Sequence, residues 1–365
     1  MRYILFTIFF ALLLIFFIKL CSKYREGFNN QNEEKTPIVK RPFVNLYDNL
    51  GNRLNVILLS KPFSGDAQYE ECLKLKKNNI IIGIASYLEF PNMVTNPYEN
   101  FTENYKKYKY KEITEGWIHC FKNPKNYFPP SMPLLFASES DFIDCNINKP
   151  DKSINKEYDF IYICLKVDSK KKLCDDWATW NKNWTLAKKC LHIFCNKYKL
   201  RGLLIGRKDC ELPYGCNDLM ETTEMLPNDE LKKMYNKSKF IFLPNEKDAS
   251  PRVLTEALAS DVPALLNKNI LGGWKYINNE TGEFFTDEND LGPAVEKMMK
   301  KINEKKYQPR AYFVKNYSII NSGKRLKKFL YNNFGHRLNI DPRNVDYVTP
   351  EFSKKDFKQC ESVYN

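Results

Sequence analysis

The feature that most constrains the fold is an alternation of short apolar runs with amphipathic segments from residue 159 onward. The segments between the runs show helical spacing at 184–198, 227–238 and 251–260. Strands that alternate with helices in this way pair in parallel. The pattern therefore predicts an α/β domain with a doubly wound parallel sheet. The apolar runs are DFIYIC (159–164), GLLIG (202–206), FIFLP (240–244), ALLN (264–267) and EFF (283–285).

The first half of the chain shows a weaker form of the same pattern. The apolar runs NVILLS (55–60) and IIIGIAS (80–86) flank a helical segment, which predicts one strand–helix–strand unit. PLLFASESDF (133–142) indicates a later strand with an acidic loop after it, whereas 91–135 gives no clear division.

A polar stretch, CNINKPDKSINKEYD (145–159), separates the two halves and marks the expected domain boundary. Because 365 residues are enough for two domains with a core each, we assign one domain to each half. The expected segments are a membrane anchor (1–22), a polar linker (23–50), a first domain (51–150), a second domain (151–335) and a C-terminal tail (336–365).

The anchor is predicted from residues 3–18, an uncharged apolar run that can span a bilayer if Lys19 extends toward the head groups. No small-residue cleavage site follows, so we interpret the run as a retained transmembrane helix and not as a signal peptide. Arg2 and the amino terminus flank one side, and Lys19, Lys23 and Arg25 flank the other. By the positive-inside rule, this balance favours a single-pass protein with its globular part in the cytosol.

The formal net charge of +13 raises nucleic acid as a partner. The lysines, however, are scattered in short groups with acidic residues between them, and no RNA- or DNA-binding motif is present. We therefore interpret the charge as a solvated lysine-rich surface and expect no nucleic-acid partner.

The eleven cysteines form no CxxC pair and show no spacing typical of a metal site. Cys164 lies in an apolar run, and Cys190 and Cys195 lie in a helical one, so we expect these to be free buried thiols. The sequence leaves the compartment open, because several sequons arise by chance in so asparagine-rich a chain. The N-glycosylation sequons begin at Asn100, Asn183, Asn236, Asn279 and Asn316.

The segment NEKDASPRVLTEALASDVPALLN (245–267) is the strongest candidate for a functional site. It follows an apolar run, and in open α/β sheets ligands bind beyond the carboxyl ends of the strands. Ser250 is a favoured helix N-cap and Pro251 a favoured first helical residue, so we expect a helix to begin there. The first amides of such a helix suit an anion such as a phosphate.

Arg252 and Glu256 are four residues apart and share a face of the predicted helix, away from its apolar stripe. A carboxylate at Glu256 can accept two hydrogen bonds from a vicinal diol such as a ribose. The alternative interpretation is a surface ion pair between Arg252 and Glu256 on an ordinary amphipathic helix.

Asp248, seven further residues and Glu256 form a pattern that resembles the signature of glycosyltransferase family 4 (glycosyltransferases group 1). The context is similar as well, with PNDELKKMYNKSKFIFLP before the loop and EALASDVPALLN after it. The resemblance covers roughly 159–333, including a closing helix at 318–333 that would cross back to the first domain. It implies a GT-B fold, with two Rossmann-like doubly wound domains and a central cleft between them.

The resemblance also implies roles for residues of this segment. Glu256 would hold the ribose of a nucleotide-sugar donor, and Asp248 would contact hydroxyls of the donor sugar. The backbone around Ser250 and Arg252 would lie near the pyrophosphate.

Two basic residues complete the implied donor site. Lys182 matches the family's pyrophosphate lysine, and Lys166 stands in place of its arginine. The insertion 167–181 between them departs from the family pattern, as does the aspartate at 248, where the family has a glutamate. His119 would be a first-domain histidine that faces the donor sugar; the alternative is a packed or surface histidine.

A lysine and helix-terminal amides can stabilise the negative charge that develops on a departing nucleotide diphosphate, so we expect no divalent metal to be required. No DxD motif stands at a strand end, because Asp175 and Asp176 fall in the insertion. Retention at the anomeric carbon is implied by the resemblance alone. Glu139 and Asp141 either line the acceptor side or cap a helix.

These observations predict a membrane-anchored, retaining, metal-independent glycosyltransferase with a glycan, lipid or protein acceptor. One alternative is a catalytically degenerate binding or scaffold subunit, which the absent arginine and the aspartate at 248 favour. The other is a sugar-nucleotide epimerase or hydrolase on the same fold. The Asn183 sequon lies beside Lys182, so either it is unused, or the domain faces the cytosol, or the assignment of Lys182 is wrong; this favours a cytosolic face.

Overall fold

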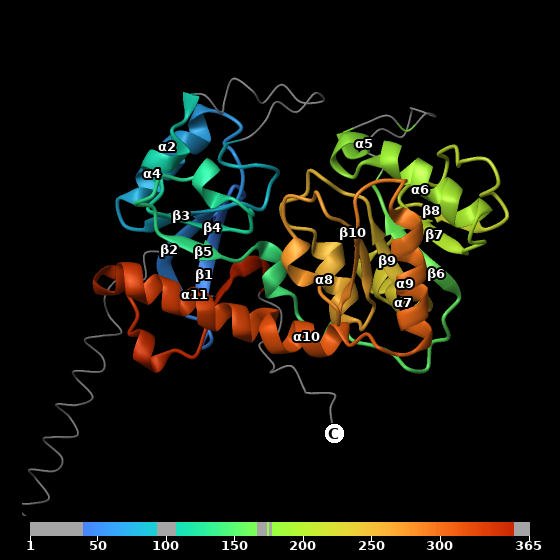
Figure 1. Cartoon of the computed structure of the whole chain (residues 1–365). Helices are drawn as coiled ribbons and strands as arrows, with labels where there is room; N and C mark the ends of the chain where they lie inside the picture. The colour runs from blue at the N-terminus through green and yellow to red at the C-terminus, as the bar shows by residue number, and fades with distance from the viewer. Residues whose placement is uncertain (1–38, 93–106, 166–173, 175–176, 354–365) are drawn as a thin grey trace, which may run out of the picture. The chain divides into compact units, whose positions relative to one another are not determined.

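The computed structural model describes residues 39–92, 107–165, 174 and 177–353. These residues contain two β-sheets, each with helices packed against it (Figure 1). The predicted anchor at 1–22 lies outside the described residues. Among the helices that are described, none combines the length and the apolar character needed to cross a bilayer.

The second sheet contains six strands that all run parallel, in the order β11-β10-β9-β6-β7-β8. In this doubly wound order the direction of winding reverses between β6 and β9. The prediction of a doubly wound parallel sheet is therefore confirmed for the second domain. The strands are β6 (Tyr158–Ile163), β7 (Gly202–Ile205), β8 (Met220–Thr223), β9 (Ser238–Leu243), β10 (Ala264–Asn267) and β11 (Gly282–Phe285).

Helices cover both faces of the second sheet. They are α5 (Trp177–Asn181), α6 (Trp184–Asn196), α7 (Asn228–Lys237), α8 (Arg252–Ala259) and α9 (Leu291–Asn303). Phe160 and Phe242 share one apolar cluster with α6 and α9. Ile161 and Ile241 point the other way, into a cluster with α7 and α8. Neighbouring strand residues thus alternate between two buried faces, which explains why these strands read as continuous apolar runs in the sequence.

The first sheet is mixed. Strands β2, β3, β4 and β5 run parallel in sequence order, but β1 pairs antiparallel with β2, and β12 pairs antiparallel with β1. The predicted α/β sheet is therefore present in the first domain, but the order of its described strands contains no reversal of winding, so this sheet is not doubly wound as predicted. The elements are β1 (Phe43–Asp48), β2 (Arg53–Leu59), α2 (Asp66–Lys76), β3 (Ile80–Ile84), α4 (Tyr110–Ile113), β4 (Gly116–His119), β5 (Leu134–Phe136) and β12 (Val348–Pro350).

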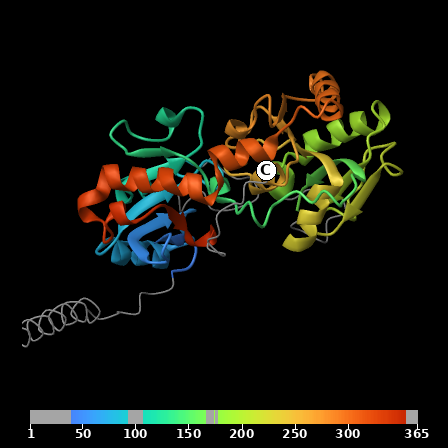
Figure 2. The same ribbon diagram turned by 90° about the horizontal axis from the view of Figure 1, so that it is seen from below.

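Helices α10 (Pro309–Asn316) and α11 (Ser318–Phe334) follow α9, and α11 returns to the first sheet. Its Leu326 and Phe329 share an apolar cluster with Val56 and Ile82 of β2 and β3, and Figure 2 shows the helix lying along these strands. The predicted closing helix is therefore confirmed. Strands β1 and β12 lie in the segments predicted as linker and tail, and both belong to the first sheet.

Two disulfides with both partners among the described residues link parts of the second domain, Cys174–Cys210 and Cys195–Cys216. The prediction of a free thiol at Cys195 is wrong, because the fold brings the end of α6 next to the loop between β7 and β8. Cys164 and Cys190 are free and buried, as predicted.

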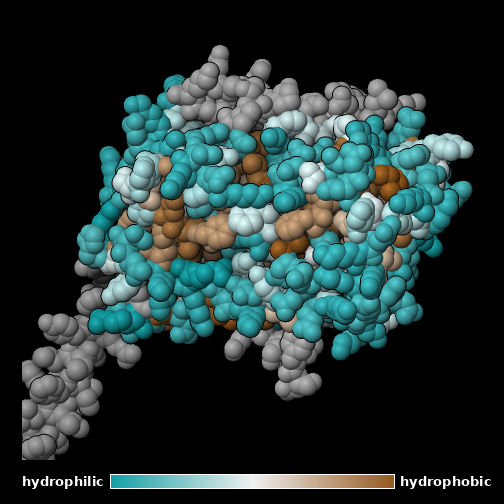
Figure 3. Space-filling model, in the orientation of Figure 1, coloured by the Kyte–Doolittle hydropathy of each residue, from teal (hydrophilic) through white to brown (hydrophobic). Residues whose placement is uncertain are grey.

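The face of the molecule drawn in Figure 3 is mostly hydrophilic, with apolar residues gathered in a band across its middle. Some surface lysines pair with carboxylates, as in Lys107–Asp66 at 2.6 Å and Lys237–Glu157 at 3.0 Å. Exposed pairs of this kind contribute about 0–1 kcal/mol each to the free energy of unfolding, so they add little to stability. Each carboxylate also offsets the charge of the lysine next to it.

Candidate functional site

The carboxyl ends of β6 and β9 lie side by side at the point where the winding of the second sheet reverses. Loops that leave two such strands turn to opposite faces of the sheet, and the crevice between them is the usual ligand site of open α/β folds. Residues 244–251 follow β9, and residues 164–183 follow β6 up to the start of α6. This edge is therefore where the chain is expected to bind a ligand.

Asp248 and Lys182 form an ion pair at this edge, with 2.5 Å between Lys182 Nζ and Asp248 Oδ2. The same oxygen accepts a hydrogen bond from Asn245 Nδ2 at 3.1 Å, and Oδ1 accepts one from the Ser250 backbone N–H at 3.2 Å. The Lys182 side chain is only 25% exposed and the Asp248 side chain only 10%, so water screens this pair less than it screens a surface pair. The structure thus brings together two residues that the sequence assigned separately to the donor site.

The residues on either side of Lys182 hold it in place. Asn181 Nδ2 donates to the Lys247 carbonyl at 2.9 Å, and Asn183 Nδ2 donates to the Glu246 carboxylate at 3.1 Å. Asn183 also has a left-handed backbone, φ 52°, and its Oδ1 caps the start of α6. Because both polar atoms of the Asn183 side chain are engaged, this sequon is not free to carry a glycan in the folded chain.

Close packing encloses the loop that carries Asp248. The Gly272 backbone N–H donates to the Asp248 carbonyl at 2.9 Å. A Cβ atom at position 272 would lie 1.9 Å from the Ala249 carbonyl oxygen, so only glycine fits there. Cys120 Sγ donates to that same carbonyl at 2.6 Å. Gly272 and Cys120 therefore hold the backbone at Asp248 and Ala249 in place.

Helix α8 begins at Arg252, and Pro251 occupies its N-cap position. The prediction that Ser250 caps this helix is wrong, because the Ser250 hydroxyl is engaged elsewhere. It accepts a hydrogen bond from the Ser140 backbone N–H at 3.0 Å and lies 2.8 Å from the Ser140 hydroxyl. The start of α8 is thus held by the segment after β5 and not by a cap of its own.

Glu256 lines a pocket of about 360 Å³ together with Arg252. The Glu256 carboxylate accepts a hydrogen bond at 3.0 Å from the hydroxyl of Tyr235, a fully buried residue whose pKa burial raises well above its usual value. The volume is in the range of small-molecule sites. A carboxylate with one donor from the protein keeps the capacity to accept further hydrogen bonds, as a diol requires. Besides Tyr235, the residues of α7 that line the same pocket are Asn228, Asp229, Leu231 and Lys232.

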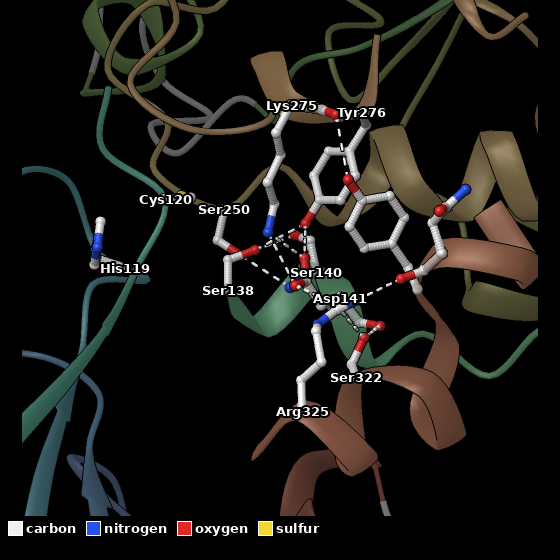
Figure 4. A network of polar contacts seen from close by, with 12 residues as sticks. His119, Cys120, Ser138, Ser140, Asp141, Ser250, Lys275, Tyr276, Ser322 and Arg325 are labelled. Carbon is white, nitrogen blue, oxygen red and sulfur yellow. Dashed lines mark hydrogen bonds and ion pairs between the residues drawn. The ribbon is translucent and has the colours of Figure 1, made fainter. Parts of the chain in front are cut away.

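Asp141 is fully buried in the 3₁₀ turn Glu139–Phe142 and is surrounded by donors from other elements (Figure 4). Lys275 Nζ lies 2.7 Å from its carboxylate and Arg325 Nη2 lies 3.2 Å from it, and Tyr276 donates its hydroxyl. Lys275 and Tyr276 come from the 3₁₀ turn Trp274–Tyr276, and Arg325 comes from α11. A buried carboxylate is tolerated only with such partners, so Asp141 ties three elements together next to Ser140.

His119, the last residue of β4, is buried among Phe121, Phe128 and Phe136. Its Nδ1 accepts the Phe121 backbone N–H at 3.2 Å. Burial, and to a lesser extent the charge of Lys275, lowers the pKa of His119 to about 4, so the ring is neutral at pH 7. Figure 4 shows the ring apart from the contacts around Asp141. Contact with a donor sugar stays a prediction for this residue.

Arg207, which was not predicted from the sequence, follows β7 at the same edge of the sheet. Its side chain is fully buried: Nε donates to Cys164 Sγ at 2.9 Å, Nη1 donates to the Cys174 carbonyl at 2.7 Å, and the guanidinium lies 4.9 Å from the Trp184 ring. A charged residue directly after the apolar run GLLIG was the available signal. Lys166, the residue predicted to replace the family's arginine, lies outside the described residues.

In the described ranges, no group of three or more His, Cys, Asp and Glu side chains is arranged to hold a metal ion. Asp175 and Asp176 are not among the residues described.

Comparison with known proteins finds similarity at the level of structure alone, because neither a protein-family model nor a curated protein matches this sequence. A sucrose-phosphate synthase from Thermosynechococcus elongatus is 12% identical with a TM-score of 0.55, over 76% of this chain and 74% of that one. HepE from Anabaena, solved with UDP and glucose, is 10% identical with a TM-score of 0.52, over 75% of this chain and 78% of HepE. TarM is 13% identical with a TM-score of 0.52, over 75% of this chain and 54% of TarM.

Identities this low establish a shared fold and nothing finer. The fold is that of the GT-B glycosyltransferases of group 1, in agreement with the resemblance seen in the segment from Asp248 to Glu256. Within that fold, the second sheet of this chain reverses its winding between β6 and β9.

Proposed function

We propose that this chain is a glycosyltransferase that moves a sugar from a nucleotide-sugar donor to a glycan, lipid or protein acceptor. The observation that carries the proposal is the Lys182–Asp248 ion pair at the winding reversal of a GT-B second domain. The Glu256 pocket, on the helix that follows Asp248, supplies the complementary feature that a nucleoside requires.

Each residue of the site has one task in this proposal. Glu256 accepts hydrogen bonds from the ribose hydroxyls, while Lys182 and the first amides of α8, near Arg252 and Ser250, contact the pyrophosphate. A diphosphate carries more negative charge than one carboxylate, so it competes for the Lys182 ammonium. Asp248 is then left to accept hydrogen bonds from the donor sugar.

The chemistry that these groups support is loss of a nucleoside diphosphate from the anomeric carbon. As the bond between that carbon and the diphosphate oxygen breaks, the electron pair stays on the diphosphate and its charge increases. Lys182 and the dipole of α8 stabilise that charge, which supports a reaction without a divalent metal. Retention of configuration rests on the family resemblance.

The nature of the partners is part of the proposal. UDP and glucose are bound in the HepE structure, which supports a nucleotide sugar as the donor here. Attachment to a membrane through residues 3–18 would favour an acceptor that is presented at a lipid surface.

The test is turnover of UDP-, GDP- and ADP-sugars by the purified full-length protein in detergent, with and without a mixed pool of glycan and lipid acceptors. The proposal predicts release of a nucleoside diphosphate that depends on the acceptor. Release without any acceptor would instead favour a hydrolase, and binding without turnover would favour a degenerate subunit. Failure to bind or turn over any donor would sink the proposal.

A further inference from the structure

We propose that the globular part of this chain matures in an oxidising, secretory-type compartment and carries an N-linked glycan on Asn279 there. The proposal does not depend on the function proposed above. Two independent features support it: the state of the cysteines, and the environment of each sequon in the described part of the chain.

The cysteines of the second domain are those of a protein exposed to oxidising conditions. Cys174–Cys210 and Cys195–Cys216 are disulfides, and Cys145 is disulfide-bonded as well. Throughout the described ranges, every cysteine that is not bonded is buried, so none presents an exposed free thiol. Structural disulfides persist in secretory compartments and are rare in the reducing cytosol.

Among the sequons that the structure describes, few have an asparagine side chain without other contacts. The Asn183 side chain is occupied by its contact with Glu246 and by capping of α6. Asn236 is buried, and its amide donates to the carbonyls of Lys149 and Lys232. Neither asparagine can carry a glycan without breaking these contacts.

Two of the other sequons are also described. Asn316 is half-buried, and its Nδ2 donates to the Tyr312 carbonyl at 2.9 Å. Asn279 is exposed, and only its backbone carbonyl accepts a hydrogen bond among the described contacts, from Lys301 at 3.3 Å. Asn279 is therefore the described sequon whose side chain is free to project into solvent.

Asn279 also lies where a large substituent is harmless. It precedes β11, which begins at Gly282 and runs parallel to β10 and β9. The site around Asp248 follows the carboxyl end of β9, whereas Asn279 lies at the amino edge of the same sheet. The turn itself is held in place, because the N–H groups of Thr281 and Gly282 both donate to the Asn278 carbonyl at 3.1 Å. A glycan at Asn279 thus leaves the candidate donor site open, unlike one at Asn183.

An oxidising, secretory-type compartment requires the globular part to lie on the non-cytosolic side of the membrane. The charges around the apolar run 3–18 favour the opposite, cytosolic orientation. Arg2 and the amino terminus stand against Lys19, Lys23 and Arg25, a difference of a single charge. Such a small bias is a weak determinant of orientation. Two disulfides within one domain are the stronger indication of compartment.

The two modifications use the ordinary chemistry of such a compartment. The Asn279 amide nitrogen attacks the anomeric carbon of a lipid-diphosphate oligosaccharide; the C–N bond forms, the C–O bond breaks, and the lipid diphosphate leaves with the electron pair while nitrogen loses a proton. Each disulfide forms when two thiols lose two electrons and two protons to a dithiol–disulfide oxidoreductase, whose own disulfide is reduced.

The experiment uses the full-length chain produced in eukaryotic cells, with free thiols alkylated before lysis. Treatment with peptide N-glycosidase is expected to increase gel mobility of the wild type and to convert Asn279 to aspartate, detected by mass spectrometry in ¹⁸O water. Asn279→Gln is expected to remove the labelled aspartate and to reduce the shift by one glycan, and the matched variant Asn183→Gln is expected to retain both. Non-reducing peptide maps should show Cys174 linked to Cys210 and Cys195 linked to Cys216.

Two results would overturn the proposal separately. An unmodified Asn279 in a protein whose disulfides are intact would remove the glycosylation site. Alkylated Cys195 and Cys216 in the quenched lysate would remove the oxidising compartment. Both readouts are independent of glycosyl transfer, so a protein with no donor turnover can still meet or fail them.

Discussion

Lys182 and Asp248 are 66 residues apart in the sequence, and they meet because β6 and β9 are neighbours in the sheet. Their pairing concentrates opposite charges at the edge where α/β proteins bind anions. The half-buried position means that each charge counts for more than it would on the surface. The single residue that matters most for chemistry is the lysine, since it alone of the two can stabilise a departing diphosphate.

Lys182→Ala is therefore expected to lower kcat for the best donor by about 10²–10³-fold, the usual cost of losing one group that stabilises developing charge. The loss is measured from steady-state release of nucleoside diphosphate. Lys189→Ala is the matched control: it removes a lysine from α6 that pairs with Glu288 at 2.6 Å, and we expect activity within twofold of the wild type, roughly the noise of surface substitutions. Equal activity of Lys182→Ala and Lys189→Ala would refute the role of Lys182.

His119 gives a residue-scale prediction about pH. Its pKa is lowered to about 4 in the folded chain by burial, against about 6.5 when unfolded, so the unfolded chain binds the extra proton first. Stability from this residue is complete above pH 6.5 and is lost as the pH falls toward 4, by about 3 kcal/mol in total. The free energy of unfolding of His119→Gln should therefore fall less over this range. The control is His192→Gln, at an exposed position on α6, whose free energy of unfolding should fall with pH as that of the wild type does. Parallel curves of the free energy of unfolding against pH for the wild type and His119→Gln would contradict the account.

At the scale of elements, the start of α8 depends on contacts from the segment after β5. Ser250 bonds Ser140, and the neighbouring Asp141 is bound by Lys275 and Arg325. These contacts replace the missing side-chain cap of α8, so the helix that carries Glu256 is placed by tertiary structure and not by its own sequence.

Asp141→Asn is expected to lower the free energy of unfolding by about 3–5 kcal/mol, because it leaves the buried Lys275 ammonium without its carboxylate. Urea unfolding measures the change. The control is Asp229→Asn, which breaks the pair of a 92%-exposed aspartate with Lys232 and should cost no more than about 1 kcal/mol. Similar losses in the two variants would show that the Asp141 cluster is no stronger than a surface pair.

The second domain could be predicted from the sequence because its strands are buried on both faces and read as apolar runs. The pair Asp248 and Glu256 was found because both lie in one continuous segment. Strand β4, GWIH, was missed because four residues with a glycine and a histidine carry no periodic signal. Two pairings between separate segments were also not predicted. They are the antiparallel pairing of β12 with β1, across most of the chain, and the disulfide between Cys195 and Cys216.

At the scale of the whole molecule, stability is distributed between packed sheets and covalent links. The Cys195–Cys216 bond spans 21 residues and joins α6 to the loop before β8. On the loop-entropy account, a link of this length stabilises the folded chain by about 3 kcal/mol.

The double variant Cys195→Ser/Cys216→Ser should therefore unfold at lower urea than the oxidised wild type, by about 3 kcal/mol in free energy. The comparison is repeated after reduction, where Cys174–Cys210 and the disulfide of Cys145 are also lost and the two proteins should converge. A double variant as stable as the oxidised wild type would show that this bond adds no net stability.

The most direct test of the central claim is donor binding to the wild type and to Glu256→Ala, measured by thermal shift and calorimetry with UDP-, GDP- and ADP-sugars. The account predicts that one donor class stabilises the wild type, by about 2.7 kcal/mol at a concentration of 100 Kd. Glu256→Ala should bind that donor about 10- to 100-fold more weakly, because it loses charge-assisted hydrogen bonds to the ribose. Glu296→Ala, at an exposed position on α9, should bind it as the wild type does. Equal affinity of Glu256→Ala and the wild type, or no donor binding to the wild type at all, would contradict the account.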